Sequence, residues 1–312
     1  MMFLRLLLPV LLALCLPCPA AEVKTLDVTW HDTKRDRDVP VRVYYDATLT
    51  TPAPVILFSH GLGGSREGYA YLGSHWAANG FISVHLQHAG SDGAVIKNGG
   101  KLTDAVAGLK ALENAAARAL DVTFVIDQLE EANKNNAALK GRLRMDALGV
   151  AGHSFGAQTT LLAAGMTMGA KSYADPRVKA AIAMSPQPPA VGERAFKNCT
   201  VPVFHMTGTL DTSPIPGHAV TPEDRLKPFQ WITGADEALL VLTGGDHMVF
   251  SGRLTASRAT DPPMQDLIKK ASTAWWKARL TGDAASDSWL REKFPAELGK
   301  AGRWEYKKAA AK

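Results

Sequence analysis

Cysteine is scarce in this chain of 312 residues, which contains only Cys15, Cys18 and Cys199. The first two lie in an N-terminal segment that we predict to be a secretory signal peptide over residues 1–21. The mature chain would keep Cys199 alone, and one cysteine cannot form an intramolecular disulfide. We expect Cys199 to be a small buried hydrophobic side chain rather than a reactive thiol.

Long hydrophobic runs are missing too. Arg5 gives the N-terminal segment its positive charge, residues 6–14 are apolar but too few to cross a membrane, and small residues at 20–21 suit signal peptidase. An uncleaved membrane anchor is the alternative interpretation. No other stretch is apolar enough to span a bilayer. We therefore expect a secreted or periplasmic protein with no stable membrane anchor after cleavage.

Basic stripes, metal-binding motifs and linkers are also absent. The net charge is +5, and the positive residues are scattered except at the C-terminus, so we expect no nucleic-acid partner. Without a His-Glu-x-x-His motif or a Cys/His cluster, neither a metal nor a cofactor is expected. No repeat or Pro/Ser-rich tract divides the chain, so residues 22–312 are predicted to form one domain. Nothing in the pattern indicates an oligomeric state.

A Gly-x-Ser-x-Gly pentapeptide is the most informative feature that the chain does contain. Gly-His-Ser-Phe-Gly at residues 152–156 follows an apolar run, 147–151, that predicts a buried strand, and it precedes a predicted helix at 157–164. A serine on such a strained strand-to-helix turn exposes its Oγ, and glycines on both sides remove side chains that would collide there. Ser154 is therefore the candidate nucleophile.

Two further candidates follow Ser154 in the chain. Asp211 comes after a strand-like run at 201–206, and His247 comes after another at 238–242. Loops that follow the C-terminal ends of strands are where open α/β sheets build their sites. The order Ser154, Asp211, His247 is that of the α/β-hydrolases. We predict that His247 is the general base and that Asp211 orients it.

Three other aspartates compete with Asp211 for the role of the acid. Asp246 adjoins His247, so its carboxylate would be hard to aim at that ring. Asp175 precedes a proline and is typical of a helix-to-strand turn. Asp236 comes before the strand that leads to His247, which puts it at the far end of the sheet.

The remaining site residues follow from strand ends. The predicted strand at 54–59 leads into a glycine-rich loop at 60–64, which can present a backbone N–H to a tetrahedral intermediate. The second N–H would come from the residue after the nucleophile, Phe155. The substrate pocket is predicted to be lined by His88, Met248 and Trp231.

Strands alternating with helices predict an α/β fold with a mostly parallel central sheet covered by helices on both faces. Because the segment after Met184 is short, we expect no large lid. The expected antiparallel edge strands are 23–30 and 39–45. The other expected strands are 55–58, 81–86, 147–151, 178–184, 201–206 and 238–242, and the expected helices are 67–79, 109–117, 122–132, 157–164, 264–280 and 286–298.

Together, these motifs resemble the α/β-hydrolase superfamily between about residues 39 and 280. Within it, the chain resembles a branch that contains platelet-activating-factor acetylhydrolase-like proteins, serine dienelactone hydrolase-like proteins and bacterial cutinase-type polyester hydrolases. The resemblance implies that Ser154 is the nucleophile, that His247 is the base, and that the backbone N–H groups of Leu62 and Phe155 form the oxyanion hole.

The chain departs from individual members of that branch at two places. Plasma acetylhydrolases carry the acid soon after the strand that follows the nucleophile, where this chain has Ala-Met-Ser-Pro at 183–186. Asp211 matches the cutinase-like arrangement instead. The aromatic clamp of polyester hydrolases is replaced by Pro-Gln-Pro-Pro at 186–189.

These observations predict a secreted serine esterase that hydrolyses small or extended carboxylic esters through an acyl-enzyme. Because no apolar insertion follows Met184, we expect a preference for acyl groups of about two to six carbons. A peptidase or amidase that uses the same triad is one alternative. A hydrolase-fold binding protein without activity is the other.

Overall fold

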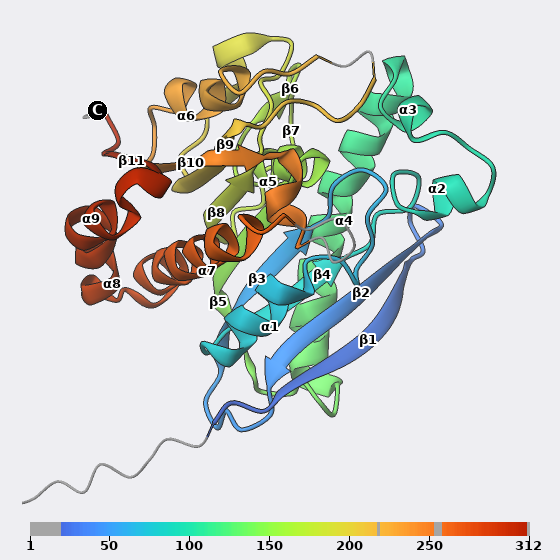
Figure 1. The fold of residues 1–312 in the computed structure, drawn as a ribbon. Coiled ribbons are helices and arrows are strands. Elements are labelled where there is room, and N and C mark those ends of the chain that lie inside the picture. Colours follow the sequence, from blue (N-terminus) through green and yellow to red (C-terminus); the bar gives the residue numbers. More distant parts are fainter. Residues whose placement is uncertain (1–19, 217–218, 253–257, 311–312) are drawn as a thin grey trace, which may run out of the picture.

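A nine-stranded sheet forms the centre of the computed structural model, which describes residues 20–216, 219–252 and 258–310. The strand order is β1-β2-β4-β3-β5-β8-β9-β10-β11 (Figure 1). Pairing is parallel from β4 to β10 and antiparallel at both edges. The strands are β1 (Val23–Asp32), β2 (Arg37–Asp46), β3 (Ala53–Ser59), β4 (Ile82–Leu86), β5 (Leu143–His153), β8 (Val178–Met184), β9 (Val203–Leu210), β10 (Glu237–Asp246) and β11 (Gly302–Lys307).

The parallel strands are apolar because helices cover both of their faces. Every residue of β3 and β4 is buried, whereas β1 at the edge alternates between exposed and half-buried positions over most of its length. The mostly parallel sheet, with antiparallel strands at residues 23–46, confirms the predicted fold class. Cys199 is buried, as expected.

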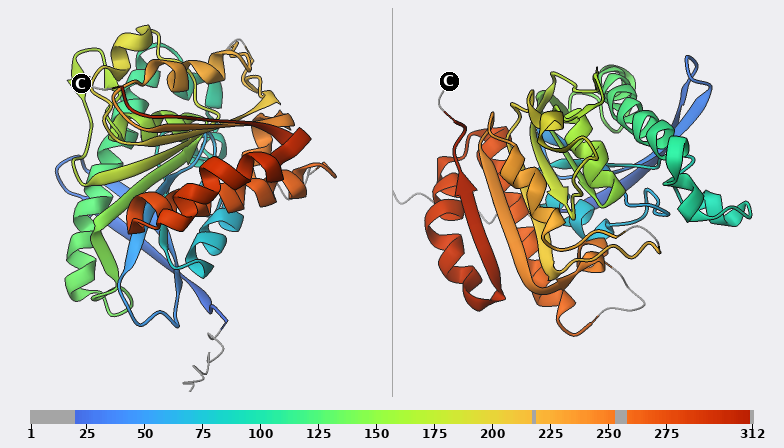
Figure 2. Two further views of the ribbon diagram at one scale, coloured as in Figure 1. Left: turned by 90° about the vertical axis from the view of Figure 1, so that its left-hand side faces the viewer. Right: turned by 90° about the horizontal axis from the view of Figure 1, so that it is seen from above.

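Helices cover both faces of the sheet (Figure 2), and a large hydrophobic core lies under each helical layer. On one face, α4 (Gly108–Asn135) and α5 (Phe155–Ala163) pack against the sheet. On the other face lie α1 (Ala70–Ala78), α7 (Asp261–Trp276), and the short helices α8 (Ala284–Ser288) and α9 (Phe294–Leu298). Trp76 of α1 and Trp276 of α7 are fully buried and meet edge to face, with ring centroids 6.0 Å apart.

The last strand was not expected from the sequence. β11 pairs antiparallel with β10 and forms the edge of the sheet on that side. Its Trp304 and Tyr306 alternate with charged residues, a pattern that is typical of an edge strand. Both rings pack against the core that α7 helps to form.

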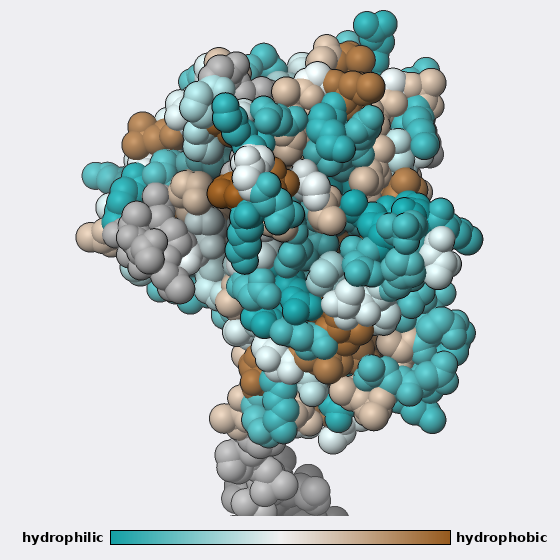
Figure 3. Space-filling model, turned by 90° about the vertical axis from the view of Figure 1, so that its right-hand side faces the viewer, coloured by the Kyte–Doolittle hydropathy of each residue, from teal (hydrophilic) through white to brown (hydrophobic). Residues whose placement is uncertain are grey.

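Two short helices between β4 and α4 were also not expected. α2 (Ala94–Lys97) and α3 (Leu102–Ala105) project beside the carboxyl ends of the strands, and this part of the chain exposes Ile96, Leu109 and Leu112. Figure 3 shows the corresponding side of the molecule, where hydrophobic side chains form small separate groups among hydrophilic ones. Within the described residues, no helix combines the length and apolar character needed to cross a membrane. Residues 1–19 lie outside the described part, so the signal peptide stays a prediction.

Candidate active site

Ser154 occupies the sharp turn between β5 and α5. Its backbone has φ 57° and ψ −118°, a conformation that non-glycine residues rarely adopt and that costs on the order of 1–3 kcal/mol. The Ser154 N–H donates to the Met184 carbonyl, at 2.9 Å, and so ties the turn to β8. A Cβ on Gly152 would lie 2.3 Å from the Gly156 carbonyl oxygen, and a Cβ on Gly156 would lie 1.9 Å from that of Ser59. The turn therefore requires glycine on both sides.

We expect Gly156→Ala to lower the free energy of unfolding by about 3 kcal/mol, the upper end of the usual cost of overpacking, because its Cβ would meet rigid backbone. Gly282→Ala is the matched control. Gly282 has φ 71° with nothing within 4 Å of its Cβ position, so only the backbone conformation resists the substitution, at about 1 kcal/mol. Urea titration of both variants measures the difference. Equal losses would contradict the steric account of the turn.

Three side chains from separate loops form one hydrogen-bonded chain at the carboxyl end of the sheet. The Nε2 of His247 lies 2.9 Å from the Oγ of Ser154, and its Nδ1 lies 2.8 Å from the Oδ1 of Asp211. Asp211 directly follows β9, and His247 directly follows β10. The structure thus brings the three predicted residues together, with Ser154 half-buried and Asp211 fully buried.

The Asp211 carboxylate is held by several donors. Its Oδ2 accepts hydrogen bonds from the hydroxyls of Ser185, at 2.6 Å, and Thr207, at 2.8 Å. Burial by itself would raise the pKa of Asp211. The hydrogen bond from His247 and the nearby charge of Arg225 outweigh burial and hold that pKa below its ordinary value. Asp211 is therefore ionised at neutral pH and aimed at the imidazole.

Arg225 is a cation beside this pair that sequence analysis did not identify. It is 2% exposed, and its guanidinium lies 3.3 Å from Asp211 Oδ1 and 3.3 Å from His247 Nδ1. It also donates to the Ser185 carbonyl, at 3.0 Å. Arg225 therefore joins the loop after β8 to the loop after β9. No local sequence pattern marks it, because its partners are distant in the chain.

The three competing aspartates make other contacts. Asp175 forms a two-pronged ion pair with Arg177, at 2.9 and 2.7 Å. Asp236 accepts from the Tyr306 hydroxyl, at 2.8 Å, at the far end of the sheet. Asp246 accepts from the backbone N–H groups of residues 248 and 249 and so caps the turn that carries His247.

Leu62 and Phe155, the two predicted oxyanion donors, both line a cavity beside Ser154. Phe155 is the first residue of α5, where N–H groups have no partner within the helix, and Leu62 lies in the loop after β3. Among the described residues, neither N–H donates to a protein acceptor. Both remain available to a carbonyl oxygen of a substrate.

Two cavities flank Ser154, and both are lined by Leu62 and Ile215. The smaller, of about 120 Å³, lies toward the start of α4 and includes Val106 and Leu112. The larger, of about 280 Å³, includes Tyr69, His153, residues 214–216, His247 and Met248. Much of the wall of the site therefore comes from residues 106–112, around the start of α4, and from residues 214–216, while the short segment after Met184 contributes Gln187.

Of the three predicted pocket residues, only Met248 lines either cavity. His88 is fully buried, with its ring bonded to Asp121 and Ser59, so it corrects the expectation that a histidine at a strand end faces the substrate. Trp231 also lies elsewhere. It packs against Phe196, with ring centroids 6.1 Å apart, because α6 (Lys227–Trp231) covers the sheet beyond the site.

Comparison with known proteins identifies the family. The model of the PET hydrolase-like family (PETase) matches residues 40–296. The chain belongs to the PET hydrolase-like family. Together with the mostly parallel nine-stranded sheet, this membership confirms the predicted α/β-hydrolase fold.

A second comparison finds a distant relative of this PET hydrolase-like chain. The platelet-activating factor acetylhydrolase of Cavia porcellus is 25% identical over 268 residues. The aligned region covers 76% of the chain but only 59% of that relative. Both comparisons fall within the branch that the sequence motifs resemble.

The described residues of this PET hydrolase-like protein contain no group of three or more His, Cys, Asp or Glu side chains placed to hold a metal ion. Ser154 and His247 line these cavities, as do Leu62 and Phe155, and the other polar side chains in the linings are Tyr69, Thr103, His153, Gln158 and Gln187. This set can supply a nucleophile, a proton acceptor and an oxyanion site.

Proposed function

We propose that the chain is an exported serine esterase that hydrolyses carboxylic esters through an acyl-enzyme. The observation that carries this proposal is the continuous hydrogen-bonded chain from Ser154 through His247 to Asp211, with the serine on a strained turn beside two cavities. Export rests on the predicted signal peptide, residues 1–21. The substrate is a small or extended ester, and neither nucleic acid nor a stable membrane anchor takes part.

In the proposed first step, His247 Nε2 accepts the proton of the Ser154 hydroxyl as Oγ attacks the ester carbonyl. The N–H groups of Leu62 and Phe155 would donate to the oxygen on which negative charge develops. Asp211 keeps the proton of the imidazole on Nδ1 and stabilises the imidazolium that forms. His247 then protonates the leaving alcohol.

In the second step, water replaces the alcohol. His247 accepts a proton from the water, which attacks the acyl-enzyme, and Ser154 leaves with the proton that the imidazole returns. All proton transfers pass through Nε2, the nitrogen that faces Ser154. No cofactor is needed for either step.

The cavity sizes support a preference for short acyl groups. An apolar cavity of about 150 Å³ accommodates benzene. The smaller cavity, of about 120 Å³, would therefore hold an acyl group of only a few carbons, leaving the larger one to the alcohol. A pair of cavities rather than a long groove agrees with small esters, or with one repeat of an extended ester at a time.

We expect kcat/KM on p-nitrophenyl esters to rise from acetyl to about butyryl or hexanoyl and then to fall. Each added methylene contributes about 0.8 kcal/mol only while apolar surface remains to receive it. Rates across acyl lengths on the purified mature chain test this expectation. Maximal activity on palmitoyl esters with activation at an oil–water interface would contradict it.

The same assay separates the two alternatives. A peptidase or amidase would cleave a p-nitroanilide with the same acyl group at a comparable rate, whereas an esterase should cleave it far more slowly. A binding protein without activity would cleave neither substrate. We expect cleavage of the ester and little cleavage of the anilide.

A further inference from the structure

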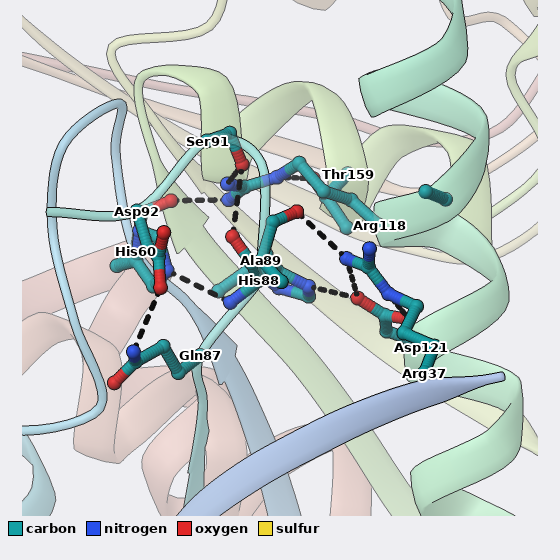
Figure 4. Close-up of polar contacts among 12 residues, drawn as sticks. Arg37, His60, Gln87, His88, Ala89, Ser91, Asp92, Arg118, Asp121 and Thr159 are labelled. Carbon is teal, nitrogen blue, oxygen red and sulfur yellow. Dashed lines mark hydrogen bonds and ion pairs between the residues drawn. The ribbon is translucent and has the colours of Figure 1, made fainter. Parts of the chain in front are cut away.

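A network of buried polar side chains lies directly behind the loop that carries the Leu62 N–H (Figure 4). Its central member is Arg118, a fully buried residue of α4. The Arg118 guanidinium donates to the Thr159 hydroxyl, at 2.9 Å, to the Ser91 hydroxyl, at 2.9 Å, and to the His60 carbonyl. These three acceptors come from three different segments of the chain.

Arg118 contacts both segments that would form the oxyanion hole. The carbonyl of His60 lies two residues before Leu62, so the bond from Arg118 orients the start of that loop. On its other side, the guanidinium lies over the ring of Phe155, 4.7 Å from the ring centroid. Phe155 supplies the second candidate N–H donor. The Arg118 side chain therefore contacts both segments that carry the candidate N–H donors, Leu62 and Phe155.

The loop that carries Leu62 is also bonded to the segment at residues 88–93, which Arg118 holds. The Gly63 N–H donates to the Ser91 carbonyl, at 2.8 Å, and the Gly93 N–H donates to the Gly64 carbonyl, at 3.0 Å. Since the Ser91 hydroxyl is an acceptor for Arg118, both segments have a common anchor.

Two histidines in this network have defined tautomers. His60 Nδ1 lies 2.6 Å from the Gly61 carbonyl and must donate to it, while its Nε2 accepts the His88 N–H at 3.1 Å. His88 Nδ1 lies 2.9 Å from Asp121, and its Nε2 lies 3.0 Å from the Ser59 hydroxyl. Burial lowers the pKa of both imidazoles, so both are neutral. Donor and acceptor are therefore defined along the hydrogen bonds that lead from Asp121 through His88 and His60 to the Gly61 carbonyl.

Arg118 carries its charge without a bonded carboxylate. Among the described residues, its hydrogen bonds go to hydroxyls and a carbonyl, whereas the neighbouring carboxylate of Asp121 is held in a two-pronged contact by Arg37, at 2.8 Å. Burial lowers the pKa of Arg118 to about 9, which leaves it charged at neutral pH. Retaining a desolvated cation with neutral partners is costly for stability and suggests a role beyond packing.

We propose that Arg118 is a positioning residue for the oxyanion hole, which holds the Leu62 and Phe155 N–H groups at the separation that the tetrahedral intermediate requires. This inference rests on the proposed esterase function. It assigns a role to a residue that touches neither the substrate nor the reacting atoms. It also explains why a cation lies on the buried face of α4.

The test compares an aryl ester with the matching thionoester. In the thionoester, negative charge develops on sulfur, a poorer hydrogen-bond acceptor than oxygen, so that substrate gains less from an oxyanion hole. In Arg118→Met, we expect kcat/KM for the ester to fall about tenfold to hundredfold, mainly through kcat. The thionoester rate should fall much less. The ratio of the two rates should therefore fall by nearly the same factor as the ester rate.

Three further variants distinguish positioning from a general structural role. Asp211→Asn should lower both rates equally and leave the ratio unchanged. Arg177→Met removes another arginine with several ion pairs, away from the cavities, and should also leave the ratio unchanged. Arg118→Lys keeps the charge but loses the planar fork, so it should give an intermediate ratio.

Thr159→Val keeps the shape of the side chain and removes one acceptor of Arg118, so it decides the question if Arg118→Met does not fold. We expect it to lower the ratio by a smaller factor. A wild-type ratio in every folded variant of Arg118 and Thr159 would overturn the inference. If the wild-type chain hydrolyses neither substrate, the proposed esterase function fails instead.

Discussion

Ser154→Ala should lower the kcat of ester hydrolysis by about 10⁴–10⁶-fold, because members of a hydrogen-bonded nucleophile–base–acid group act as a unit. The loss follows from the geometry of the turn, where Ser154 Oγ is the atom within 2.9 Å of His247 Nε2. The fold should persist, since the substitution removes a single hydroxyl from a half-buried side chain. Initial rates on a p-nitrophenyl butyrate assay and the unfolding temperature measure the two effects separately.

A second serine provides a matched control for this variant. Ser59 also belongs to a Ser–His–Asp chain, formed with His88 and Asp121, at 3.0 and 2.9 Å. That chain is buried, and Ser59 lines neither cavity beside Ser154. Hydrogen-bond geometry alone therefore does not distinguish the two serines, but access to substrate does. The Ser59→Ala variant should still react with a serine-directed probe, because Ser154 is unchanged.

Asp211→Asn should lower kcat by about 10⁴-fold while leaving the structure intact. An amide can donate to the imidazole and so stabilises the wrong tautomer, and it provides no negative charge beside the imidazolium. Circular dichroism would check the fold, and single-turnover kinetics would locate the loss in the acylation step.

Asp175→Asn is the matched control, because Asp175 is also buried but pairs with Arg177 rather than with His247. It should keep kcat within a few-fold of wild type and lower stability instead. If Asp175→Asn were the more damaging variant for turnover, the role proposed for Asp211 would be wrong.

The residues around Ser154 were predictable because each one follows a strand. Parallel strands place their carboxyl ends along one edge of the sheet, so strand-end positions far apart in sequence meet there. That rule correctly brought Ser154, Asp211 and His247 together. It failed for His88, which also follows a strand, because the rule does not say whether a ring points toward the cavity or toward Asp121.

Of the two buried arginines beside the site, Arg118 could have been identified from the sequence and Arg225 could not. Arg118 lies on the same face of α4 as Val122, Val125 and Leu129, which are apolar and buried. A charge in such a stripe needs a buried partner, so this position could have been identified. Arg225 has no such pattern, because its position depends on contacts with loops after β8 and β9.

The walls of the site could not be predicted for a similar reason. Ile215 borders both cavities from a loop whose conformation no local periodicity indicates, and whether Leu112 of α4 faces a cavity depends on how that loop and the helix meet. β11 was different, since its alternation of aromatic and charged residues was visible in the sequence, and Gly299 and Gly302 separate it from the preceding helix.

The most direct test of the account is to locate the adduct of a fluorophosphonate on the protein. After reaction of the purified mature chain with the probe, peptide mass spectrometry should find one modification, on Ser154, and hydrolysis should be lost in proportion to labelling. Ser154→Ala should acquire no adduct, while Ser59→Ala should be labelled to the same extent as wild type. An adduct on another residue, or labelling that survives Ser154→Ala, would contradict the assignment of Ser154 as the nucleophile.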